Sequence, residues 1–357
     1  MLPLDDPAFI ASVDEKKMLR CVDQLPDVAL PAFSRGRACP LPPGEFRSVF
    51  ICGMGGSAIS GELLRTVAAK NCPWPVWVHR GDQLPQWVGD DTLCIFLSYS
   101  GNTAETLDTL REATQRNLKI VLITSGGSAQ ALAQVKGFPV VELPAGWQPR
   151  AAIGDLYFSL LGVVSQLPGF PPLRVTETAA VLQSARTQYG VANPFDSNPA
   201  KKLAAALLKK TPFILGVQGS TDSIAVRWKC QLNENAKTTA LYGILPEFTH
   251  NDIVNLTAMP HPQTVIIKLF DAADTELVQR QSNHAMDLLR PWVGNIFSFA
   301  GIGETVLERQ LHLLILGDYV SVYLGILSGF DPTPVDAIGE LKRRMAVDEV
   351  HQVELRP

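Results

Sequence analysis

Residues 92–110, TLCIFLSYSGNTAETLDTL, pass from an apolar run through a polar turn into a helical pattern. The run at 92–98 has the composition of a buried strand, and residues 103–116 have the apolar spacing of a helix. A buried strand that leads directly into a helix is typical of a parallel sheet covered by helices on both faces. This segment therefore predicts an α/β fold.

The same alternation extends along most of the chain. We expect strands at 48–52, 75–79, 92–98, 119–124, 138–143, 212–217, 264–270 and 295–300. We expect helices at about 58–70, 103–116, 128–135, 151–167, 176–190, 199–209, 222–237, 275–290, 304–328 and 334–346. The pattern predicts two doubly wound domains, each a parallel sheet flanked by helices, followed by a C-terminal helix. The break PGFPPL at 168–173 favours domains at 1–167 and 168–357.

Two segments in the two halves echo each other. FICGMGGS at 50–57 and FILGVQGS at 213–220 both run from an apolar strand into a GxxGS turn and then a helix. Such turns are common, but the order of elements around them repeats as well. The two predicted domains are therefore expected to be related.

Composition limits the class of protein. The net charge of −4 and the pI of about 5.9 favour neither a nucleic-acid nor a membrane partner. The N-terminus lacks a signal-peptide pattern, and no apolar run approaches the roughly 18 residues of a membrane-spanning helix. The six cysteines show no CxxC spacing, and several lie in apolar runs, as expected of reduced thiols in the cytoplasm.

The turn GMGGSA at 53–58 formally satisfies the GxGxxA pattern of dinucleotide-binding proteins through Gly53, Gly55 and Ala58. That pattern wants an acidic residue at the end of the second strand, where this chain has His79. The absence of GK[ST] excludes a P-loop. Two interpretations stay open, namely a turn for close packing and a glycine-walled anion or sugar pocket.

The turn SYSGNTAE at 98–105 is more informative. Asn102 and Glu105 have the spacing of a capping box, which would account for two of its polar residues. The hydroxyls of Ser98, Ser100 and Thr103 are then left over. Hydroxyls at the carboxyl edge of a sheet, beside a helix N-terminus, favour a phosphate site, with helix capping as the alternative.

Two further polar residues do not stand out by themselves. Glu234 lies near the end of a predicted helix, where a carboxylate is usually solvated. His250 lies in a polar turn, where a capping or surface role is the commoner one.

Five motifs together resemble the bifunctional phosphoglucose/phosphomannose isomerases, two-domain members of the sugar isomerase (SIS) fold. They are GMGGSAISGELL, SYSGNTAETL, QPRAAIGDLYFSLL, NENAKTTALYGILPEFTHND and GDYVSVYLGILSGFDPTPVDAIGELKRRM. The resemblance implies SIS-type domains and an aldose–ketose isomerase acting on glucose 6-phosphate, and on mannose 6-phosphate as well, with fructose 6-phosphate as the ketose. It also implies a homodimer.

The resemblance assigns roles at the matching positions. Ser98, Ser100 and Thr103 would hold the phosphate of the sugar. Gly56 and Ser57 would line the sugar itself.

The remaining roles implied by the resemblance concern the chemistry. Glu234 would be the base that moves the proton, and Arg150 would lie by C1 and C2 and stabilise the enediolate. His250, donated by the neighbouring subunit, and Lys342 would assist ring opening. These residue types suit the reaction, since one carboxylate can carry a proton between adjacent carbons while a guanidinium stabilises the oxyanion. Neither a metal nor a nicotinamide cofactor is expected.

One segment departs from the family pattern. Members commonly have YNHNE where this chain has FTHND at 248–252, and the tryptophan that usually follows is missing from IVNL at 253–256. His250 is kept, while Asp252 is one methylene shorter than the usual acid. A sugar-phosphate binding or sensing protein, or an isomerase for another phosphosugar, is therefore the alternative. A nicotinamide dehydrogenase is a distant third.

Overall fold

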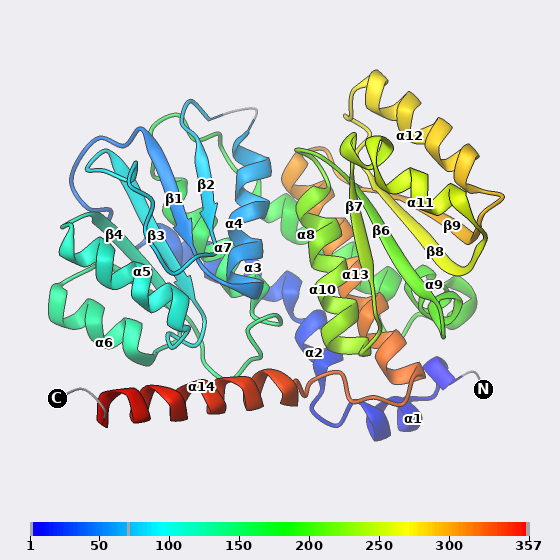
Figure 1. Ribbon diagram of the computed structural model, residues 1–357, viewed down its shortest axis with the longest axis horizontal. Helices are drawn as coiled ribbons and strands as arrows, with labels where there is room; N and C mark the ends of the chain where they lie inside the picture. The colour runs from blue at the N-terminus through cyan, green and yellow to red at the C-terminus, as the bar shows by residue number, and fades with distance from the viewer. Residues whose placement is uncertain (1–2, 70–71, 355–357) are drawn as a thin grey trace.

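The structure is a computed structural model that describes residues 3–69 and 72–354, with side chains described up to residue 345. The first half contains a five-stranded parallel sheet in the order β2-β1-β3-β4-β5 (Figure 1). Its strands are β1 (Ser48–Cys52), β2 (Val76–His79), β3 (Thr92–Ser98), β4 (Lys119–Thr124) and β5 (Val140–Glu142). The helices around this sheet are α3 (Leu25–Arg37), α4 (Gly55–Ala68), α5 (Ala104–Gln115), α6 (Gly127–Lys136) and α7 (Ile153–Val164).

The central strands β1, β3 and β4 are apolar and buried at nearly every position because both faces of the sheet are covered there. Along β3, Leu93, Ile95 and Leu97 join a core shared with α3, α4 and α7. The alternate residues Cys94 and Phe96 pack instead with residues of α5 and α6. A continuous apolar run is what a strand buried on two sides requires.

The second half repeats this plan with a four-stranded parallel sheet in the order β7-β6-β8-β9. Its strands are β6 (Thr211–Val217), β7 (Leu241–Leu245), β8 (His261–Phe270) and β9 (Val293–Ala300). The segments around it are α8 (Val175–Tyr189), η2 (Phe195–Ser197), α9 (Pro199–Leu207), α10 (Asp222–Ala236), η3 (Glu247–His250), α11 (Asp252–Ala258), α12 (Glu276–Leu289) and α13 (Val306–Leu327). In both sheets the first strand lies between the second and the third, so the echo between FICGMGGS and FILGVQGS reflects a repeated architecture.

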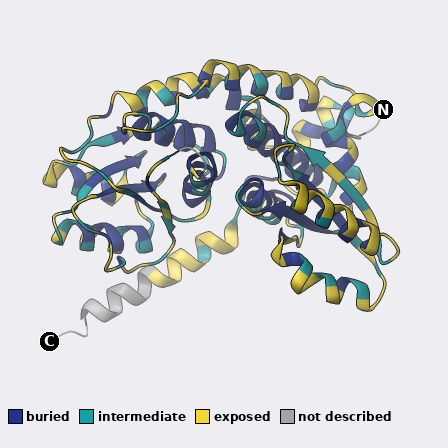
Figure 2. Ribbon diagram, turned by 90° about the horizontal axis from the view of Figure 1, so that it is seen from above, coloured by how far each residue is buried: buried dark blue, intermediate teal, exposed yellow. Residues whose placement is uncertain are grey.

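One large core joins the two halves. It runs from Leu4 to Ile326 and includes the inward faces of both sheets. The helix α13 belongs to this core and, in contrast to the expectation from the sequence, is long and apolar enough to cross a membrane, but its side chains are almost all buried against the rest of the protein (Figure 2). Its apolar surface is thus accounted for by the core. The N-terminal segments η1 (Pro3–Asp5), α1 (Pro7–Val13) and α2 (Met18–Asp23) precede α3 along this core.

The last helix, α14 (Asp336–Glu354), differs from the others. It extends away from the rest of the chain, and its described side chains are nearly all exposed (Figures 1 and 2). The predicted C-terminal helix therefore exists, and it extends beyond residue 346.

The predicted order of elements is confirmed, with three strands matching to the residue: β1, β3 and β4. We did not predict β7, α11 or the bounds of the three N-terminal helices α1, α2 and α3. β7 exposes Leu241 and Tyr242 and contains Gly243, so it lacks the signature of a buried strand. The domain boundary near residue 167 stays a prediction.

Candidate active site

The two glycine- and serine-containing turns of the first half meet at one edge of its sheet. The strand order reverses between β1 and β3, and such a switch point opens a crevice at the carboxyl ends of the strands. A Cβ atom on Gly53, after β1, would lie 2.7 Å from the carbonyl oxygen of Leu97 in β3. A Cβ on Gly56 would lie 3.2 Å from the Cα of Arg150. The glycines therefore allow three chain segments to converge.

The expected sugar and phosphate residues lie around this crevice. Ser57 is buried in the first turn of α4, directly after Gly56. Ser98 is buried at the end of β3, and its hydroxyl donates to Thr103 Oγ1 at 3.2 Å. Ser100 is exposed, and Thr103 is the N-cap residue of α5 without making a side-chain capping bond. The N-terminal N–H groups of α5 and these hydroxyls together suit an anion.

The predicted capping box is wrong. Asn102 does not cap α5, because its Oδ1 accepts a hydrogen bond of 2.9 Å from the backbone N–H of Ser128, at the start of α6. Gly101 has a φ of 65°, and a Cβ there would lie 1.8 Å from the carbonyl oxygen of Gly126. The turn at 98–103 is therefore held against the neighbouring turn at 125–128.

Arg150 is a buried cation between the two halves of the chain. It follows β5 and precedes α7, and its side chain is only 4% exposed. Its NH1 lies 3.4 Å from Glu234 Oε2, so residues far apart in sequence form an ion pair. Burial lowers the pKa of Arg150, an effect that the Glu234 carboxylate opposes. A guanidinium remains protonated in spite of such a shift.

Glu234 lies in the last turn of α10, and 32% of its side chain is exposed. It can therefore reach a ligand while remaining beside a fixed positive charge. A carboxylate paired with an immobile guanidinium can remove a proton from carbon and have the resulting oxyanion stabilised close by.

Not all predicted residues join this group. His250 is exposed in η3, which follows β7 at the carboxyl edge of the second sheet. Glu234 lies at the opposite, amino edge, because α10 runs back across the sheet from Asp222. The separation along α10 from Asp222 is about 18 Å at ~1.5 Å per residue.

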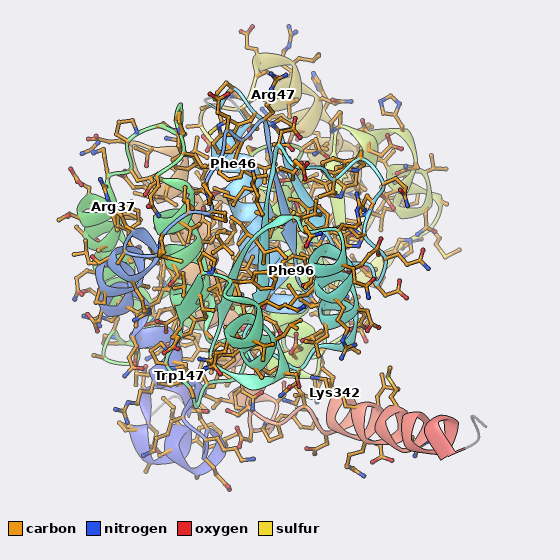
Figure 3. All side chains as sticks on the ribbon, turned by 90° about the vertical axis from the view of Figure 1, so that its left-hand side faces the viewer. Arg37, Phe46, Arg47, Phe96, Trp147 and Lys342 are labelled. Carbon is orange, nitrogen blue, oxygen red and sulfur yellow. The ribbon has the colours of Figure 1, made fainter. Side chains whose placement is uncertain are left out.

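Lys342 lies on α14. It is exposed and borders a groove of about 480 Å³ that is also lined by Gln148 and Lys16. Figure 3 shows Lys342 at the edge of the molecule where α14 begins to project, with Trp147 at the same edge. Because Gln148 is two residues from Arg150, this groove adjoins the segment that carries the buried cation.

Asn235 and Lys237 are two neighbours of this site that we did not predict. Asn235 Oδ1 accepts a 2.7 Å bond from Arg150 Nε, and Lys237 Nζ donates to the carbonyl oxygens of Glu234, Asp331 and Pro332 at 2.8–3.0 Å. Burial, followed by the charge of Arg150, lowers the pKa of Lys237. Both residues stand in the motif NENAK, which was the available signal.

Among the side chains that the structure describes, at residues 3–69 and 72–345, no three His, Cys, Asp or Glu gather in a way that could hold a metal ion. The turn at 53–58 packs against Leu97 and Arg150, so its glycines serve close approach between chain segments.

Comparisons with known proteins show to which family the chain belongs. A model of the SIS domain matches residues 45–135, and a model of the bacterial phospho-glucose isomerase C-terminal SIS domain matches residues 196–345. The chain is 37% identical to the bifunctional phosphoglucose/phosphomannose isomerase of Caldicellulosiruptor bescii, over 92% of this chain and 99% of that protein. It is 31% identical to the protein of the same name from Aquifex aeolicus, over 84% and 91% of the two chains.

Solved structures with low sequence identity share the fold. A hypothetical protein of Thermus thermophilus superposes with a TM-score of 0.74 at 15% identity, covering 95% of this chain and 93% of that one. This likeness supports the arrangement of two SIS-type α/β halves.

Proposed function

The chain belongs to the bifunctional phosphoglucose/phosphomannose isomerase family, and on that premise we propose that it interconverts glucose 6-phosphate and mannose 6-phosphate with fructose 6-phosphate. This proposal rests on the pair formed by Glu234 and Arg150, whose Oε2 and NH1 atoms lie 3.4 Å apart beside the crevice where the two glycine- and serine-containing turns converge. A base beside a fixed cation is what proton transfer between adjacent carbons requires.

The phosphate is bound by the turn after β3. Ser98, Ser100 and Thr103 supply hydroxyls, and the first turn of α5 supplies N–H groups. The sugar extends from there past Gly56 and Ser57 toward Arg150, whose Cα would lie 3.2 Å from a Cβ atom on Gly56. Phosphate binding thus fixes the distance between the anion and the reacting carbons.

Glu234 removes the proton from C2 of the open-chain aldose and returns it to C1. Electrons of the broken C–H bond form the C1–C2 double bond of an enediolate, whose negative oxygen is stabilised by Arg150 NH1. The hydroxyl proton on O2 then passes to O1, and as C1 takes up the proton from Glu234 the C2–O2 bond becomes the carbonyl of the ketose. The reverse sequence regenerates the aldose, and delivery to either face of C2 yields glucose or mannose 6-phosphate. Each step needs only groups of this chain, so the proposal includes no metal and no nicotinamide.

Turnover of fructose 6-phosphate tests this function directly. Glucose 6-phosphate and mannose 6-phosphate should both appear with the purified protein, and Glu234→Gln should lower kcat by about 10³-fold or more, because the amide cannot accept the proton. Full turnover by Glu234→Gln would remove the mechanism. Saturable binding of fructose 6-phosphate without turnover would instead favour a sensor, with the FTHND segment as its cause.

The remaining roles rest on the second copy of the chain and on α14. The topology supports donation of His250 by a neighbouring subunit in a homodimer, because His250 and Glu234 of one chain lie at opposite edges of the sheet. Lys342 borders the groove next to Gln148, which supports a part in ring opening.

The six cysteines are free, as expected for a protein of the cytoplasm.

A further inference from the structure

The guanidinium of Arg150 has most of its hydrogen-bonding capacity occupied by the chain itself. An arginine side chain has five N–H donors in a planar fork. Nε donates to Asn235 Oδ1 at 2.7 Å, and NH2 donates to the carbonyl oxygens of Pro332 and Thr333 at 2.9 Å each. Only NH1 remains, and it faces Glu234. The fork is therefore held so that a single nitrogen is presented to the substrate.

Asn235 can hold Nε in only one way. Its side chain is completely buried, and its Nδ2 donates to Ser321 Oγ at 2.9 Å. Ser321 Oγ in turn donates to the carbonyl oxygen of Asp318 at 2.8 Å, which ties the chain of bonds to α13. Because Arg150 Nε is a donor only, the amide oxygen must face it, and Ser321 fixes that orientation.

Lys237 holds one of the two carbonyl groups that bind NH2, that of Pro332. It terminates α10 in the left-handed conformation with a φ of 51°, and this turns its side chain back over the helix end. Its ammonium has three hydrogens and makes three bonds, to Glu234, Asp331 and Pro332. The carbonyl of Pro332 thus accepts from both Lys237 and Arg150. Without Lys237 the turn before α14 loses the direct bonds of Asp331 and Pro332 to the residue that ends the helix carrying Glu234.

A buried ion pair fixes the backbone of Arg150 in the same way. Arg227 NH2 donates to the carbonyl oxygen of Arg150 at 3.2 Å. Arg227 is itself held by both oxygens of Asp318, at 2.7 and 3.0 Å. The backbone and Nε of Arg150 are therefore both fixed relative to α13, a helix whose residues are nearly all buried.

We propose that Asn235 and Lys237 are positioning residues that restrict Arg150 to presenting NH1 alone to Glu234 and to the enediolate oxygen. This inference rests on the proposed isomerase function and deepens it. Neither residue needs to touch the substrate. Their effect is to keep the guanidinium in the geometry of the intermediate before the substrate arrives, so that no reorganisation is needed during the reaction.

Steady-state kinetics with deuterated substrate test the proposal. Asn235→Ala should lower kcat by about 10- to 100-fold while KM for glucose 6-phosphate stays within about twofold, because the phosphate turn is untouched. With [2-²H]glucose 6-phosphate, the isotope effect on kcat should rise, since a less stabilised enediolate makes proton removal more rate-limiting. Lys237→Met should change both quantities in the same direction. An isotope effect does not depend on the fraction of folded enzyme.

Asn198→Ala is the matched control. Asn198 is as completely buried as Asn235 and donates to the carbonyl of Tyr189, but it caps α9 and is not bonded to Arg150. It should lower thermal stability without changing the isotope effect. An unchanged kcat and isotope effect in Asn235→Ala and Lys237→Met, with active wild-type protein, would overturn the positioning role alone. Absence of turnover by the wild-type protein would overturn the proposed function instead.

Discussion

At the scale of single residues, the stability of this protein is expected to depend on pH through one buried histidine. His312 on α13 is 4% exposed, with one ring nitrogen 2.9 Å from the hydroxyl of Tyr189 and the other without a partner among the described residues. Burial lowers the pKa of His312 to about 4. The imidazole is therefore neutral in the folded protein at neutral pH.

The protein should lose stability as the medium becomes mildly acidic. An unfolded histidine has a pKa near 6.5, so between that value and about 4 the unfolded chain binds the additional proton. The free energy of unfolding should fall by about 2 kcal/mol from this residue between pH ~7 and pH ~5. Urea unfolding at both pH values measures it.

His312→Gln should remove most of this difference, because the amide stays uncharged and can still pair with Tyr189. His284→Gln is the control, since His284 is exposed on α12. If the wild-type protein and His312→Gln lose equal stability between the two pH values, His312 is not the group responsible.

At the scale of whole elements, the second half repeats the fold of the first, but turns after its strands carry carboxylates where the first half has the proposed phosphate site. The turn after β6 resembles the turn after β1, but Asp222 Oδ2 accepts the N–H of Gly219 and pairs with Arg65 at 2.9 Å, so a carboxylate of the chain occupies the helix N-terminus. After β8, the position of the hydroxyl-rich turn is taken by Asp271 and Asp274. Carboxylates there disfavour a phosphate.

The turn after β3 depends on its close packing against the next turn. Gly101→Ala would place a Cβ 1.8 Å from the carbonyl oxygen of Gly126, at a φ of 65°. The turn must then shift, so we expect KM for fructose 6-phosphate to rise by about 10-fold or more and the melting temperature to fall. Kinetics and thermal unfolding measure both.

Gly137→Ala separates packing from backbone strain. Gly137 also has a positive φ, of 75°, but a Cβ there meets nothing within 4 Å. It should cost about 1–2 kcal/mol of stability and leave KM unchanged. Equal KM values for Gly101→Ala and wild type would mean that this turn does not bind the phosphate.

The sequence predicts elements well where burial is two-sided and poorly where a tertiary neighbour decides. β3 and β4 are continuous apolar runs and were predicted to the residue, whereas the partly exposed β7 has no such pattern. The spacing of Asn102 and Glu105 could not indicate that the amide faces Ser128, because that contact depends on the order of strands. Spacing along the sequence therefore predicts local structure but not contacts between distant segments.

At the scale of the whole molecule, the proposed site is assembled from both halves by the shared core. Arg150 comes from the loop before α7, Glu234 from α10, and the carbonyl groups that hold Arg150 from the segment before α14. The motifs could name Arg150 and Glu234 as members of one site through a family resemblance. Their approach to 3.4 Å, and the parts of Asn235 and Lys237, depend on packing that sequence spacing does not encode.

The arrangement of the whole molecule predicts that two copies of the chain are needed for a complete site. His250 and Glu234 of one chain lie at opposite edges of the second sheet, so His250 would act in the site of its partner. Chains carrying Glu234→Gln and His250→Ala, co-expressed with different affinity tags, can be purified as heterodimers. One of the two sites then combines an intact Glu234 with an intact His250, and about half of the wild-type activity should return.

Each variant homodimer alone supplies the baseline for this complementation, and a heterodimer of wild type with Glu234→Gln supplies the value for one intact site. If His250 acted within its own chain, both sites of the mixed dimer would carry a defect, and activity would stay at the level of the variant homodimers. Failure to recover any doubly tagged species would contradict the homodimer itself. Ring-closed glucose 6-phosphate is the substrate to use, because ring opening is the step that His250 is proposed to assist, and the readout then reports on that residue rather than on proton transfer by Glu234.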